Sequence, residues 1–93
     1  MAKTTQFTVD NVGNPEAVTA DQTCRKITIR EQGAAGTTDY FVRAPTSTDA
    51  QYRKVAGEST VFEAYGNNLF QQGDTVGYVE TVSGSVTFSK ICE

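Results

Sequence analysis

Histidine is absent from this chain of 93 residues, and its absence limits the chemistry that the other polar residues can perform. A Ser-His-Asp or Cys-His device needs an imidazole as its base, so neither can be built. What remains is a pair of carboxylates, as in glycoside hydrolysis. Glu63, Asp74 and Glu80 are the candidates, since neighbouring strands could bring them together. Eleven acidic residues on a small surface produce such pairs by chance, so we expect no enzyme activity.

The two cysteines, Cys24 and Cys92, lie far apart in the sequence and match no metal-ligand spacing. We expect both to be small buried apolar residues. The alternative is a disulfide, which would stabilise the fold by roughly 4 kcal/mol in the chain-entropy model. Such a bond would require an oxidising compartment or an assembled particle outside the cell.

Two kinds of ligand site can be weighed from the residue types. The loop from Asp10 to Glu16 carries oxygen-bearing side chains of the kind that calcium prefers. The same residues are typical of any tight loop, and we expect a turn with no metal and no cofactor. Four tyrosines could stack on sugar rings, so a carbohydrate-binding module is the alternative function; they are Tyr40, Tyr52, Tyr65 and Tyr78. Tyrosine in a small β-domain is more often a core residue with its hydroxyl at the rim.

Composition narrows the classes of partner. The net charge is -3 and the eight basic residues are scattered along the chain, which argues against a phosphate-neutralising nucleic-acid surface. No apolar run approaches the roughly 20 residues that span a membrane. The N-terminal residues are polar and lack the apolar core of a secretory signal. We therefore expect a protein made in a cytoplasm that binds neither nucleic acid nor membrane.

The elements that must position these residues are short strands. The chain contains 14 threonines, whose branched side chains suit a pleated sheet. Alternating apolar residues between turn signals predict strands over residues 4–9, 16–20, 23–31, 39–44, 51–55, 60–65, 75–82 and 85–92. Six to eight short strands at this spacing predict an all-β fold. We expect a single antiparallel β-sandwich, jelly-roll-like or Ig-like, formed by one domain over residues 1–93.

Two segments bear on how this domain contacts others. The polar corner Ser83-Gly84 predicts a hairpin between the last two strands, and Gly77 before it indicates a bulge or a close backbone approach. Residues 1–9 are either an edge strand of the chain's own sheet or an N-terminal arm lent to a neighbour. The candidate interface residues are Phe7, Val9, Tyr65 and Phe70.

The order of the segments resembles that of short structural proteins of tailed phages. These chains commonly show a strand with a basic start, a Gly-rich loop, an AGES-type turn and a final segment carrying SGS before a terminal strand. The corresponding segments are CRKITIREQG, DYFVRAP, VAGESTVF and GDTVGYVETVSGSVTF, which together span roughly Ala17 to Cys92.

The resemblance implies a non-enzymatic virion component, most of all a capsid decoration or head-stabilising protein. Its expected partner is the major capsid protein or another virion protein. We also expect a homo-oligomer, a trimer at three-fold positions being the preferred assembly. Such proteins carry no catalytic residues, so the resemblance assigns none.

Overall fold

The computed structural model describes residues 2–9, 15–32, 38–45 and 52–93, which form strands and no helix, so the predicted all-β class is confirmed. The strands are β1 (Lys3–Val9), β2 (Glu16–Thr19), β3 (Lys26–Glu31), β4 (Tyr40–Arg43), β5 (Tyr52–Lys54), β6 (Thr60–Glu63), β7 (Thr75–Thr81) and β8 (Val86–Cys92). No helix in the described ranges is long and apolar enough to cross a membrane.

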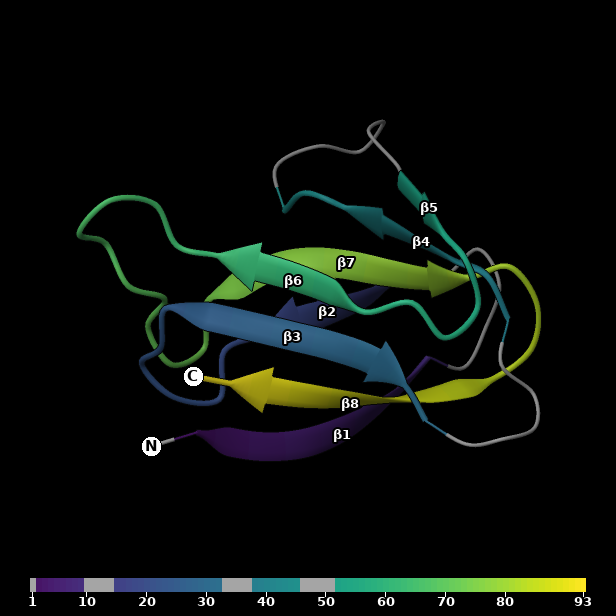
Figure 1. Cartoon of the computed structure of the whole chain (residues 1–93), viewed down its shortest axis with the longest axis horizontal. Helices are drawn as coiled ribbons and strands as arrows, with labels where there is room; N and C mark the ends of the chain where they lie inside the picture. The colour runs from purple at the N-terminus through teal and green to yellow at the C-terminus, as the bar shows by residue number, and fades with distance from the viewer. Residues whose placement is uncertain (1, 10–14, 33–37, 46–51) are drawn as a thin grey trace.

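Two four-stranded antiparallel sheets pack together, with the orders β1-β8-β3-β6 and β2-β7-β4-β5. In Figure 1, β3 and β6 of the first sheet lie in front of β2 and β7 of the second. Each strand of the first half pairs with its counterpart in the second half: β1 with β8, β2 with β7, β3 with β6, and β4 with β5. One long hairpin rolled up on itself gives this pairing, which is the jelly-roll arrangement rather than the Ig-like one.

The predicted hairpin between the last two strands is wrong. β7 pairs with β2 and β4, whereas β8 pairs with β1 and β3 in the other sheet. The Ser83-Gly84 corner therefore carries the chain from one sheet to the other. Gly84 makes this turn with a φ of 72°, and the Thr81 hydroxyl donates to the Gly84 carbonyl at 2.8 Å. A hairpin within one sheet and a crossing between two sheets both require a tight polar corner, so the sequence of the corner could not distinguish between them.

The core lies between the sheets and is built around aromatic rings. Phe88 on β8 is fully buried, stacks on Phe7 at 5.3 Å between ring centroids, and meets Tyr40 edge-on at 5.1 Å. Ile27 and Ile29 on β3 are also fully buried. β1 therefore belongs to the chain's own sheet, paired with β8 over its whole length, and it is not a detached arm in the single chain.

The cysteines form a disulfide, so the expectation of two separate buried residues was incomplete. Cys24 and Cys92 are both buried, and their Cα atoms are 5.9 Å apart. The alternation of β3 would place Cys24 on the outer face, but β3 starts only at Lys26 and the chain bends at Arg25. Cys24 instead pairs with Phe70 in an isolated bridge. This bend turns the Cys24 side chain inward, where its sulfur meets that of Cys92 at the end of β8.

Candidate functional site

An open groove of about 1000 Å³ lies along one edge of the sandwich, between β6 of the first sheet and β4 and β5 of the second. Both β5 and β6 are edge strands, so neither has a neighbouring strand on its outer side within the described residues. The groove continues past the end of β6 to Tyr65 and Phe70. In Figure 1, β6 lies above β3 and in front of β7, and β5 lies above β4 at the top of the view.

Three of the large apolar side chains that are exposed in the described part of the chain line the groove, namely Tyr52, Val61 and Tyr65. Among the described residues, the large apolar side chains that are exposed all come from residues 52–69: Tyr52, Val55, Val61, Tyr65 and Leu69. Tyr65 is 88% exposed and Tyr52 66% exposed. With about 150–250 Å² for each aromatic side chain, the two tyrosines expose roughly 300 Å² beside the groove, as much as the largest patch on a typical monomer. We call Tyr52, Val61 and Tyr65, which all line the groove, the apolar rim.

The floor of the groove depends on Gly77. The ring of Phe62 lies over this glycine, and a Cβ there would come within 2.7 Å of the Phe62 Cε1 atom and 2.9 Å of the Arg43 carbonyl oxygen. The register of β2 against β7 shifts here, since Val18 pairs with Gly77 and Thr19 with Thr75. Gly77 was predicted to mark a bulge or a close backbone approach; the close approach is confirmed, and it lies beside an irregularity in the register.

The cations beside the groove are each paired with an acid. Arg43 contacts Glu80 at 3.1 Å, Arg53 contacts Asp39 at 2.9 Å, and Lys54 contacts Glu58 at 3.6 Å. The groove wall is thus electrically balanced at each basic residue, which favours an apolar partner over an anionic ligand.

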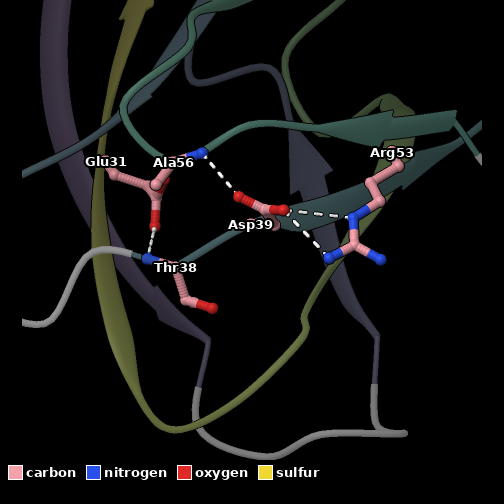
Figure 2. A network of polar contacts seen from close by, with 5 residues as sticks. All are labelled: Glu31, Thr38, Asp39, Arg53 and Ala56. Atoms are coloured by element: carbon pink, nitrogen blue, oxygen red, sulfur yellow. Dashed lines mark hydrogen bonds and ion pairs between the residues drawn. The ribbon is translucent and has the colours of Figure 1, made fainter.

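A polar network fixes the segment between β5 and β6, which forms one wall of the groove. Asp39 accepts hydrogen bonds from the Arg53 guanidinium and from the Ala56 N–H, and Figure 2 shows the carboxylate lying between them. The hydrogen bonds from Arg53 and Ala56, together with the positive charge of Arg53, hold the pKa of Asp39 below its ordinary value. Asp39 therefore stays ionised in mild acid and ties β5 to the start of β4.

The second carboxylate of the network is buried. Glu31, at the end of β3, accepts from the Thr38 N–H at 3.0 Å and from the Gly57 N–H at 2.8 Å, and its bond to Thr38 is drawn in Figure 2. The Tyr40 hydroxyl donates to the Glu58 carbonyl and lies 2.8 Å from the Thr60 hydroxyl. Burial, and to a smaller extent the nearby acids Glu31 and Glu58, raise the pKa of Tyr40. Sequence reasoning treated this segment as an ordinary turn and gave no signal that two distant acids hold it.

The predicted interface residues fall on opposite edges of the sandwich. Tyr65 and Phe70 line the groove. Phe7 lies on β1, half-buried against Phe88. Val9 is fully buried in the core, and its side chain cannot contact a partner. The alternation of β1 placed Phe7 and Val9 on the same face, but that face points into the molecule.

The other candidates are not brought together. Glu80 is paired with Arg43, the Asp74 carboxylate accepts from the Gln71 N–H in its own turn, and Glu63 ends β6 in the other sheet. Within the described ranges no group of three metal-ligating side chains is present. Residues 10–14 of the calcium candidate loop lie outside the described residues.

The tyrosines are divided by burial. Tyr40 is fully buried and Tyr78 half-buried, whereas Tyr52 and Tyr65 are exposed beside the groove.

Comparisons of the chain with protein-family models, curated proteins and solved structures give no match.

Proposed function

We propose that this protein is a non-enzymatic structural protein of a virion that docks onto a capsid protein through the groove and its apolar rim. The observation that carries the proposal is the gathering of exposed apolar side chains at one open edge. An exposed apolar cluster of this size is typical of a protein-binding surface. The segment order that resembles phage structural proteins supplies the virion context, and jelly rolls are common among viral capsid domains. Because one fold serves many functions, the groove carries more weight than the topology.

Co-sedimentation of the purified protein with empty capsids that lack it tests this proposal. Wild-type protein should sediment with the capsids to a saturable stoichiometry. Y65A should weaken the binding at least tenfold, because a well-packed aromatic anchor contributes about 2 kcal/mol or more to an interface. Y78A is the matched control, since Tyr78 does not line the groove. Equal binding of Y65A and wild type, or no binding by either, would contradict the proposal.

The second candidate function is carbohydrate binding, favoured by the exposed rings of Tyr52 and Tyr65 beside the same groove. Aromatic faces offer the flat apolar surface on which a sugar ring can stack. A glycan array, followed by titration of Y52A and Y65A, separates the two functions. A saturable glycan ligand lost in both variants, with no capsid binding, would establish this candidate in place of the first.

A further inference from the structure

The outer edge of β6 exposes backbone groups that can be assigned from the strand register. The Ala64 N–H donates to the Arg25 carbonyl at 2.9 Å, and Lys26 pairs with Glu63 in the next position. Hydrogen-bonded positions alternate along an antiparallel pair, so Thr60, Phe62 and Ala64 direct their backbone groups to β3. Val61 and Glu63 consequently direct theirs outward, where β6 has no neighbouring strand in the described structure.

The other three sheet edges carry features that discourage the addition of a strand. β5 is only three residues long and holds the charged Arg53 and Lys54. β2 carries Glu16 and a register irregularity after Val18. β1 begins with Lys3 and exposes polar side chains along its outer face. β6 also carries an acid, Glu63, at its end, but it has no proline, lysine or irregular register, and its central Val61 is 49% exposed.

We propose that β6 pairs antiparallel with β6 of a second copy of this chain, about a two-fold axis through Phe62. The unpaired strand edge supplies backbone donors and acceptors, and the two tyrosines of the adjoining apolar rim supply roughly 300 Å² of the approximately 800 Å² that a standard interface hides on each partner. The paired cations of the groove wall leave no unbalanced basic group to desolvate. A second copy brings the same apolar surface to the contact, so the patch is covered on both copies at once.

The register follows from which backbone groups face outward. An axis through Phe62 places Val61 of each copy opposite Glu63 of the other. The hydrogen bonds of these pairs run between the two copies and use only residues that belong to β6. An axis through Glu63 would set two carboxylates directly opposite each other, which is unfavourable. An axis through Val61 would require pairing by Ser59, which lies outside the strand. The chosen axis also brings the two Phe62 side chains together, so the two grooves meet there.

This pairing covers the apolar rim that is also the proposed capsid contact, so the second copy and the capsid protein would compete for the rim. It favours a two-fold contact over the expected trimer. Sedimentation velocity over a concentration series should show a monomer–dimer equilibrium for the wild type. V61P should raise the dimer dissociation constant at least tenfold without loss of folding, because the Val61 N–H does not bond to β3. V61E provides a second variant that keeps the N–H but sets a carboxylate opposite Glu63 of the other copy, which is unfavourable. T4E, on the exposed face of edge strand β1, is the matched control and should dimerise like the wild type.

Cysteine cross-linking then tests the register, with the native disulfide kept oxidised. A mixture of V61C and E63C should form a disulfide-linked dimer, since residues opposite each other at hydrogen-bonded positions have Cα atoms about 5.5 Å apart. Neither variant alone should cross-link. A monomeric wild type at all concentrations, unchanged dimerisation of V61P and V61E, or self-linking of V61C would overturn the proposal. Capsid binding by a strictly monomeric protein would overturn this pairing and leave the virion function standing.

Discussion

Removal of the Cys24–Cys92 disulfide should destabilise the protein strongly because of the length of chain that the bond encloses. The two cysteines are 68 residues apart. In the chain-entropy model, a closed loop of this length restricts the unfolded state by about 4 kcal/mol at 25 °C. A small domain has a total stability of about 5–15 kcal/mol, so reduction should remove a large part of it. Both residues lie in the core, where substitution by serine would add the penalty of buried hydroxyls.

Urea unfolding of the oxidised and reduced wild type is the direct assay. With an m-value of about 1–3 kcal/mol/M, the loss should lower the unfolding midpoint by roughly 1.5–4 M. The double variant C24A/C92A should resemble the reduced protein and should not respond to reductant, which controls for effects of the reductant itself. A midpoint that moves by less than the equivalent of about 1 kcal/mol would refute the reasoning, because the unfolded chain would then not be restricted by this bond.

Three further perturbations test how the sheets are held together. G77A should cost about 1–3 kcal/mol by overpacking, since the new methyl group meets the Arg43 carbonyl and the Phe62 ring; chemical denaturation, with the exposed S83A as control, measures it. E31Q should lower the free energy of unfolding by about 1–3 kcal/mol, because an amide nitrogen replaces one oxygen that accepts from a backbone N–H. Faster hydrogen exchange at the Gly57 amide would locate the effect, and the control variant E63Q should not show it. Burial of Asp21 raises its pKa, but hydrogen bonds from Thr5 and Lys90 and the charge of Lys90 outweigh this and lower the pKa below 3.8. A folded-state pKa below the unfolded value gives stability that is present above about pH 4 and lost as the pH falls toward the folded-state pKa. D21N should therefore reduce the loss of stability in acid, and an unchanged pH profile would contradict this assignment.

The strands could be predicted because their alternation is local information. Ile27 and Ile29 in β3, and Val86 and Phe88 in β8, mark the buried face without any knowledge of the partner strand. The same alternation does not say which strand lies alongside. For this reason the corner at Ser83 was interpreted as a hairpin, although β7 and β8 belong to different sheets.

The groove could be predicted only in part. Tyr65 and Phe70 were chosen as apolar residues near loop ends, and the fold brings both to the same groove. The wall held by Glu31 and Asp39 depends on contacts with residues 56 and 57, which come from a different part of the chain. Cys24 was expected to be buried and is buried, but its bond to Cys92 could not be predicted, because the bend at Arg25 breaks the alternation that would have oriented its side chain. Non-local pairing decided each of these outcomes.

The two edges of the sandwich differ in how completely the chain closes them. At the β1–β2 edge, buried Lys90 donates to the Thr19 carbonyl at 2.7 Å and pairs with Asp21 at 3.1 Å, while the Thr5 hydroxyl donates to the same carboxylate. These contacts join the two sheets without a partner. At the β5–β6 edge the sheets diverge around the groove, and the polar network holds only one wall. The β6 pairing proposed above would bury the apolar rim and so add hydrophobic stabilisation at this edge.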